Sequence, residues 1–204
     1  MNKPQEDEII RRVRAGDTDA FGLLVDEYQK NVYNLALRMT GSPEDAQDMS
    51  QEAFIKAYNS LSSFRGDSKF SVWLYRIVSN VCLDFLRSRS KNQPMSLNVE
   101  LDDGETELDI PDLRSLPEDE LERALTRQAV RDGLDALPTD QRQILLLREI
   151  EGFSYEEICR ILDLEEGTVK SRIFRARKNL CARLLSGGNI PEKYASEEQK
   201  KVKA

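Results

Sequence analysis

Residues 151–180 are EGFSYEEICRILDLEEGTVKSRIFRARKNL, which predicts two short amphipathic helices joined by a tight turn that contains a glycine. Ser154, followed three residues later by Glu157, forms the pattern of a capping box at the start of the first helix. Thr168, directly after Gly167, is the expected cap of the second helix. Each cap stabilises its helix by about 1 kcal/mol. The segment therefore predicts a helix-turn-helix.

The predicted second helix has an apolar side and a basic side. Its apolar stripe, which should face the first helix, consists of Val169, Ile173, Ala176 and Leu180. The opposite side carries Lys170, Ser171, Phe174, Arg175 and Lys178. The middle of that side can reach base edges in a major groove, while Arg172 and Arg177 flank it at angles that suit phosphates. The alternative is a basic helix that is merely solvated.

Composition excludes most catalytic chemistry. The chain has 204 residues, a net charge of −7 and no histidine, which removes Ser-His-Asp and Cys-His systems and most zinc sites. Glycine-rich phosphate loops are also missing from the sequence. We therefore expect no enzyme activity, metal or cofactor. Cys82, Cys159 and Cys181 lie in apolar helical patterns and are interpreted as core residues in a reducing compartment.

No apolar run near twenty residues and no signal segment is present, so we expect a soluble protein of the cytoplasm. The helical periodicity predicts an all-α fold with two small helical domains joined by a flexible acidic linker. The predicted parts are a front block at 6–91, a linker at 92–117, a rear domain at 118–184 and a mobile tail at 185–204.

Helix boundaries follow from local signals. In the front block, Gly16 and Gly41 should end the first two helices, and Ser42-Pro43 should start a third that runs to about Leu61. A fourth should span about 69–89. In the rear domain, the sequence predicts a helix after Pro117, a break at Pro138, and a strongly apolar helix beneath the helix-turn-helix.

The linker region is strongly acidic. Between Glu100 and Glu122 eleven acidic residues accompany one basic residue, Arg114. Their mutual repulsion should extend the segment. A plain solvated tether and a docking role both fit this composition.

The fourth helix of the front block suggests a second nucleic-acid surface. One stripe outside its apolar face carries Trp73, Arg76, Asn80 and Arg87. The preceding loop, Ser63-Phe64-Arg65-Gly66-Asp67, places an aromatic ring between a cation and a glycine hinge. Such a ring can stack on an unpaired base, a contact worth about 1–3 kcal/mol. Alternatively, Phe64 and Trp73 complete the core.

The third helix carries a different surface. Its expected inward residues are Ala46, Met49, Ala53 and Ala57, and its expected outward residues are Asp45, Asp48, Glu52, Ile55 and Asn59. Acids around an isoleucine suit a basic protein partner better than DNA. An ordinary solvated face is the alternative.

Four segments taken in order resemble the sigma-70 family of bacterial transcription initiation factors, and more narrowly its extracytoplasmic-function (ECF) class. They are DAQDMSQEAFIKAY, LSSFRGDSKFSVWLYRIVSN, LPTDQRQILLLREIEGFSYEEICRIL and EEGTVKSRIFRARKNL. The resemblance covers roughly residues 6–184. It implies a factor that binds core RNA polymerase and directs promoter-specific initiation, recognising the −35 element as duplex and the −10 element as melted strand.

The resemblance also implies a role for each surface. The front block would be sigma region 2 and the rear domain sigma region 4. The −35 contacts would come from Thr168, Lys170, Ser171, Arg172, Phe174, Arg175 and Lys178. The −10 contacts would come from Lys56, Phe64, Arg65, Trp73, Arg76 and Asn80. Core polymerase would bind Asp45, Asp48, Gln51 and Glu52.

The implied partners are core RNA polymerase, promoter DNA and an anti-sigma protein, often membrane-bound, with the chain itself monomeric. One competing hypothesis is a dimeric helix-turn-helix regulator that binds an operator tightly by itself. Another is a helical adaptor that binds only protein, which would leave the basic stripe and the loop aromatic unused.

Overall fold

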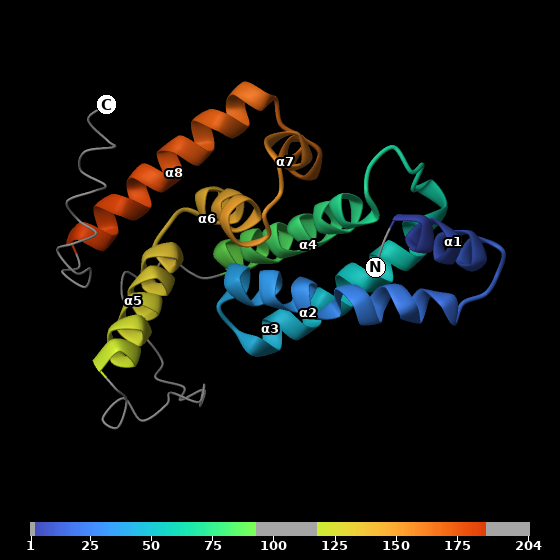
Figure 1. The fold of residues 1–204 in the computed structure, drawn as a ribbon, viewed down its shortest axis with the longest axis horizontal. Helices are drawn as coiled ribbons and strands as arrows, with labels where there is room; N and C mark the ends of the chain where they lie inside the picture. The colour runs from blue at the N-terminus through green and yellow to red at the C-terminus, as the bar shows by residue number, and fades with distance from the viewer. Residues whose placement is uncertain (1–2, 93–117, 187–204) are drawn as a thin grey trace. The chain divides into compact units, whose positions relative to one another are not determined.

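The computed structural model describes residues 3–92 and 118–186, and every regular element in those ranges is helical. The expected all-α class is confirmed. Figure 1 shows the helices in chain order from α1 to α8. The acidic linker and the tail beyond Ser186 lie outside the described residues, so the predictions made for them stay predictions.

The front block follows the predicted boundaries closely. Its elements are α1 (Lys3–Arg14), α2 (Ala20–Thr40), α3 (Pro43–Ser60), the 3-10 turn η1 (Leu61–Ser63) and α4 (Phe70–Asn92). Gly41 ends α2 in the left-handed conformation, with φ 77°, and its N–H donates to the carbonyl of Leu37. Ser42 caps α3 by accepting a hydrogen bond of 3.2 Å from the N–H of Asp45. Both start and stop signals are confirmed.

Helices α2 and α3 pack along each other, and small side chains allow this. Ala46, Ala53 and Ala57 of α3 are completely buried, and Met49 is 7 % exposed. Alanine has no atoms beyond Cβ, so the helix axes can approach closely. The predicted inward face of α3 is therefore confirmed.

The rear elements begin with a long helix and continue through shorter ones. They are α5 (Glu118–Asp135), α6 (Thr139–Leu145), the π-helical turn η2 (Leu146–Ile150), α7 (Tyr155–Leu162) and α8 (Glu166–Ser186). The break at Pro138 is confirmed. The apolar helix expected after it is interrupted by η2, whose wider turn is closed by a 3.0 Å hydrogen bond from Glu151 N–H to Leu146 O. Leu146 and Leu147, adjacent in sequence, are both fully buried there.

The capping prediction for the helix-turn-helix is right at one helix and wrong at the other. Ser154 and Glu157 form the predicted capping box of α7. Helix α8, however, begins at Glu166, so Thr168 lies inside its first turn and does not cap it. The left-handed residue of the turn is Asp163, with φ 55°, and not Gly167. Aspartate tolerates this conformation better than most side chains, so the left-handed residue lies four positions before Gly167 and α8 has already begun when the chain reaches the glycine.

The contacts divide the chain into two compact units. The first contains Met1–Ser90 and Pro138–Ala176, and the second contains Lys91–Leu137 and Arg177–Ala204. The helix-turn-helix up to Ala176 thus belongs to the same unit as the front block. The domain boundaries expected at 91 and 118 remain predictions.

In the first unit, two groups of fully buried apolar side chains form the core. In the front block they include Leu24, Leu35, Met39, Leu74 and Val78. In the rear elements they include Ile144, Leu146, Leu147, Ile158, Ile161 and Ile173. Cys82 is also buried, and desolvation raises the pKa of its thiol to about 12. Its predicted core position is confirmed, whereas Cys159 and Cys181, predicted to lie in the core as well, are only half-buried.

Candidate nucleic-acid interfaces

The outer face of α8 is a continuous exposed surface. Its predicted members Lys170, Ser171, Phe174, Arg175 and Lys178 are all exposed. Val169, Ile173 and Ala176 on the opposite side are buried, with exposures of 0–1 %, as the helical projection predicted, while Leu180, the fourth predicted member of the stripe, is half-buried. Thr168 and Arg172 are half-buried at the margins of the face. The buried stripe fixes the rotation of α8, so its basic face is presented to solvent.

Phe174 is the most unusual side chain on this face. It is 68 % exposed, although a phenylalanine side chain normally finds cover. Arg175 beside it is held against its own helix, because its Nε donates to Ser171 O at 3.3 Å and its Nη2 lies 3.5 Å from Ser171 Oγ. Ser171 Oγ in turn donates to Thr168 O at 3.0 Å. An apolar ring beside an ordered guanidinium can recognise base edges in a major groove.

Only one close carboxylate of α8 faces this basic surface. Glu166 Oε1 lies 2.6 Å from Lys170 Nζ, and this hydrogen bond raises the pKa of Lys170. Both side chains are more than half exposed, so the pair is weak in water. A phosphate could replace the carboxylate at little cost.

The loop aromatic of the front block lies in the core. Phe64 is 6 % exposed, and its ring centroid lies 5.8 Å from that of Phe70 and 5.3 Å from that of Trp73. Arg14 fixes the loop by donating to the carbonyl oxygens of Leu61 and Phe64. Of the two interpretations left open by the sequence, this conformation matches completion of the core. In this conformation the ring of Phe64 is not exposed for stacking on a base.

The remaining −10 candidates lie at varied depths. Arg65, Arg76 and Asn80 are exposed, as expected of a binding surface, and Trp73 is half-buried against Phe64 and Phe70. Lys56 forms an ion pair of 2.6 Å with Glu52 one turn earlier on α3. Arg76 lies 3.8 Å from Asp163 at the end of α7. This last contact could not be predicted from the sequence, because the two residues are far apart in the chain.

The outward face of α3 has the expected acidic residues and more apolar area than predicted. Asp48 and Gln51 are exposed, while Asp45 and Glu52 are half-buried, with Asp45 Oδ2 3.0 Å from Arg89 Nη1. Ile55 is 61 % exposed. Tyr58, which the sequence analysis missed, is 40 % exposed although its ring contacts Phe21 edge-on. Its position one turn after Ile55 was the available signal.

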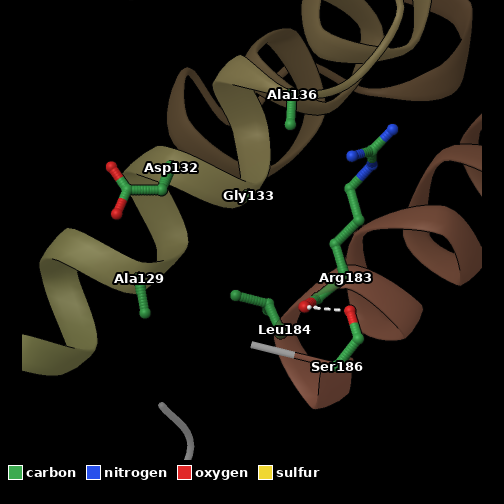
Figure 2. A pocket seen from close by; sticks show the side chains of 7 residues that line it. All are labelled: Ala129, Asp132, Gly133, Ala136, Arg183, Leu184 and Ser186. Atoms are coloured by element: carbon green, nitrogen blue, oxygen red, sulfur yellow. Dashed lines mark hydrogen bonds between the residues drawn. The ribbon is translucent and has the colours of Figure 1, made fainter. Parts of the chain in front are cut away.

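A hollow between α5 and the end of α8 lies in the second unit (Figure 2). It has a volume of about 280 Å³ and is lined by Ala129, Asp132, Gly133, Ala136, Arg183, Leu184 and Ser186. Gly133 permits the close approach of the helices here, because a Cβ at this position would lie 2.9 Å from Leu180 Cδ1. The lining is mostly small residues and offers no set of converging polar groups.

Residues 3–92 and 118–186 contain neither a cluster of metal-binding side chains nor a helix that could span a membrane. Within these ranges no group of three or more metal-binding side chains comes together. Nor does any helix in them have the length and apolar character needed to cross a bilayer.

Comparison with known proteins matches both the front block and the rear elements to one family. The family models for sigma-70 region 2 and sigma-70 region 4 match residues 24–92 and 127–180. The RNA polymerase sigma-H factor of Pseudomonas aeruginosa is 41 % identical over 181 residues, which cover 87 % of this chain and 93 % of the relative. The ECF RNA polymerase sigma-E factor of Escherichia coli is 42 % identical, with coverages of 87 % and 94 %.

A solved structure has a similar fold. CnrH, in complex with the cytosolic domain of CnrY, aligns with a TM-score of 0.63 and 25 % identity over 89 % of this chain and 98 % of that chain. Together with the relatives, this likeness accounts for both the front block and the helix-turn-helix. The chain belongs to the sigma-70 family of RNA polymerase sigma factors, in the extracytoplasmic-function class, and acts in promoter-specific initiation of transcription rather than as an enzyme.

Proposed function

We propose that this chain brings core RNA polymerase to promoters by recognising the −35 element as duplex through α8 and the −10 element as melted strand through α4 and the loop before it. The observation that carries the proposal is the outer face of α8, where exposed basic residues surround an exposed Phe174 above a fully buried stripe. A helix of this kind fits the major groove of B-DNA.

For the −35 element, base contacts are assigned to the middle of the helix and phosphate contacts to its margins. Arg175 can donate two hydrogen bonds to a guanine, a contact worth about 1–3 kcal/mol of discrimination. Phe174 can contact the methyl group of thymine, the one apolar group in that groove. The full set of proposed −35 residues is Thr168, Lys170, Ser171, Arg172, Phe174, Arg175 and Lys178.

For the −10 element, the exposed Arg65, Arg76 and Asn80 are the proposed first contacts. Phe64 must leave its packing against Phe70 and Trp73 before it can stack on a base. Unstacking DNA costs a few kcal/mol per step, and captured bases can offset part of that cost. Lys56 and Trp73 complete the proposed −10 set.

The polymerase-binding surface is assigned to α3. Asp45, Asp48, Gln51 and Glu52 supply its polar part, and the exposed Ile55 supplies apolar area beside them. Charge complementarity to a basic partner would speed association and fix the register, while burial of Ile55 would add affinity.

The proposal also covers the domain bounds, the cellular location, the oligomeric state and the control of the chain. Region 2 would occupy 6–91 and region 4 would occupy 118–184, with an acidic linker between them and a tail without assigned role. We expect a cytoplasmic monomer controlled by an anti-sigma protein that is often membrane-bound. The structural neighbour CnrH, which was solved with a cytosolic domain of CnrY, supports control by a second protein.

Run-off transcription with purified core polymerase over a library of genomic promoters tests the proposal. Addition of the chain to sigma-free polymerase should produce initiation at a defined set of promoters sharing two sequence elements. Failure to confer specific initiation would contradict it, above all if the chain alone saturated a palindromic duplex tightly. That result would favour a dimeric helix-turn-helix regulator.

A further inference from the structure

The last residue of α1 contacts the loop that carries Phe64. Arg14 donates to Leu61 O from Nη2 at 3.0 Å and from Nε at 3.3 Å, and its Nη2 also donates to Phe64 O. All three residues belong to the first compact unit. One guanidinium therefore joins the first residue of η1 to the residue that follows this turn.

Arg14 can serve two carbonyl oxygens because its guanidinium is planar and carries its N–H donors in fixed directions. Leu61 O also accepts a hydrogen bond of 3.2 Å from the N–H of Phe64, which closes the 3-10 turn from within. The backbone from Leu61 to Phe64 is thus held from inside by the turn and from outside by α1.

Helix α1 is itself anchored near both of its ends. Near its start, the buried Glu6 carboxylate accepts a hydrogen bond from the Tyr28 hydroxyl, and the Tyr28 ring lies 5.5 Å from that of Phe70. Near its end, Arg12 donates from Nε and Nη2 to Asp17 Oδ2 at 3.0 and 2.7 Å. The cation that holds the loop therefore projects from a firmly anchored helix.

The loop exposes polar side chains beside the two held carbonyls. Ser62, Ser63 and Arg65 are exposed. Leu61 and Phe64 are buried, with exposures of 2 % and 6 %. Because the backbone is fixed at the buried residues, the directions of the exposed side chains are restricted as well. A surface prearranged in this way binds its ligand more tightly and more selectively, since less conformational entropy is lost on binding.

The hydrogen bonds of Arg14 end on backbone oxygens and leave the side chain of Phe64 able to rotate. Rotation about the Cα–Cβ bond moves the ring without moving the carbonyl oxygen of the same residue. The ring can therefore leave Phe70 and Trp73 while Arg14 keeps the backbone of the loop in place.

We propose that Arg14 is a positioning residue for the −10 element, which holds the backbone of the loop while the exposed side chains of the loop, Arg65 above all, contact the melted strand. The inference rests on the proposed −10 function of α4 and the loop before it. It assigns Arg14 no contact with DNA. A direct bond from this guanidinium to a phosphate is the alternative that the test must exclude.

Tryptophan fluorescence of the free full-length chain tests the hold of Arg14 on the loop without reference to DNA. Trp73 is the only tryptophan of the sequence, and its ring lies 5.3 Å from that of Phe64. Arg14→Ala should shift its emission to longer wavelength and increase its quenching by acrylamide. The matched control, Arg11→Ala, removes the same charge from an exposed position of α1 and should change neither property. An unchanged Trp73 signal in Arg14→Ala would overturn the hold.

Binding of a premelted promoter by the chain assembled with core polymerase tests the positioning. Two templates carry an unpaired −10 strand, one matched to the element that run-off transcription identifies and one altered in a single base. Arg14→Ala should weaken binding of the matched strand about three- to tenfold and reduce the preference for it, with unchanged affinity for the −35 duplex. Misfolded protein would lower binding of both strands equally, so the preference reports on the loop alone.

Arg14→Lys separates positioning from charge. Lysine keeps the positive charge but carries a single nitrogen, so it cannot reproduce the fork of donors that serves two carbonyls. It should show most of the loss of preference, and both variants should keep the wild-type dependence of binding on salt. Full rescue by lysine, or a salt slope smaller by about one in Arg14→Ala, would indicate a phosphate contact and contradict the proposal.

Arg65→Ala distinguishes failure of this inference from failure of the proposed −10 function. If Arg65→Ala weakens binding of the matched strand and Arg14→Ala does not, the −10 function stands and the positioning role of Arg14 is wrong. If Arg14→Ala, Arg65→Ala and Asn80→Ala all bind both strands like the wild type, the −10 assignment fails and the positioning role fails with it, even where the fluorescence shift shows that Arg14 holds the loop.

Discussion

The two proposed DNA surfaces differ in how exposed their phenylalanine side chains are. Phe174 on α8 is 68 % exposed, with basic residues around it, whereas Phe64 before α4 is 6 % exposed and packs against two other aromatic rings. The basic side chains of the two surfaces also differ in what they contact. Arg175 is ordered by its own helix, while Lys69 and Arg76 meet carboxylates from another element.

The difference matches what each proposed ligand requires. Duplex DNA exists before the protein arrives, so a surface for it can be permanently exposed. A melted strand exists only after opening, so a surface for it can remain packed until then. We infer that α8 is preformed for its ligand, and that Phe64 must first leave its packing against Phe70 and Trp73.

The largest effect that tests this comparison is on stability. Phe64→Ala should destabilise the protein by about 3–5 kcal/mol, because it removes a ring from a packed core. Phe174→Ala, its matched control, should change stability by about 0.5 kcal/mol or less. Urea unfolding of the two variants measures both values. Equal stabilities would mean that Phe64 is not held in the core in solution.

Loss of the Arg175 guanidinium should have the next largest effect, on recognition of duplex DNA. Arg175→Ala should lower the affinity of the polymerase complex for a −35 duplex by about 1–3 kcal/mol, which corresponds to roughly five- to 150-fold. The protein should keep its affinity for polymerase. Quantitative footprinting on matched and mutated −35 elements measures the loss and its dependence on sequence.

The control for this change is Arg160→Ala, an exposed arginine on α7 outside the proposed surface. It removes the same charge and should leave discrimination between the two duplexes unchanged. If Arg175→Ala weakened polymerase binding as much as duplex binding, the assignment of the α8 face would be wrong.

The sequence predicted the exposed face of α8 better than the position of Phe64, and the reason is geometric. Helical periodicity fixes the direction of every side chain on α8 once Val169, Ile173 and Ala176 are recognised as the buried stripe. A loop residue such as Phe64 has no such constraint. Composition alone could not decide between a stacking ring and a core ring, and the aromatic residues of α4 that cover it became visible only in three dimensions.

The other features that the sequence did not predict depend on the three-dimensional fold and not on a local spacing of residues. The turn before α8 depends on the left-handed Asp163, whereas the sequence signal pointed to Gly167. The ion pair of Arg76 with Asp163 joins residues that only the fold brings together. Local signals with a fixed spacing, such as Ser154 with Glu157 or Ser42 with Asp45, were predictable because their atoms are neighbours in any helix start.

A smaller effect is expected at the proposed polymerase-binding surface on α3. Asp48→Arg on α3 should weaken association with core polymerase about two- to fivefold, because it reverses a charge on an exposed face without disturbing the core. Asp26→Arg on α2, also exposed, is the matched control. Co-purification and association rates at two salt concentrations measure the change, and normal association of Asp48→Arg would remove this face from the proposed partner site.

The smallest expected effect concerns the link between α7 and Lys69. Desolvation alone would raise the pKa of Glu157, but the hydrogen bond from Ser154 N–H and the ammonium of Lys69 outweigh it and hold the pKa below its ordinary value. A lowered pKa means that the ionised form stabilises the fold. This contribution is complete above the ordinary glutamate pKa and is lost as the pH falls through the lowered value.

Glu157→Gln keeps the capping acceptor but cannot titrate. The wild type should therefore exceed it in stability by about 1 kcal/mol or less at neutral pH, and this advantage should shrink as the pH falls toward 3. Urea unfolding of both proteins along this pH series measures the difference. Lys69→Met should reduce the pH-dependent part, since it removes the cation outside α7. A constant difference from neutral to acidic pH would show that the carboxylate of Glu157 gains nothing from its charge, and the contact between α7 and Lys69 would lose its electrostatic basis.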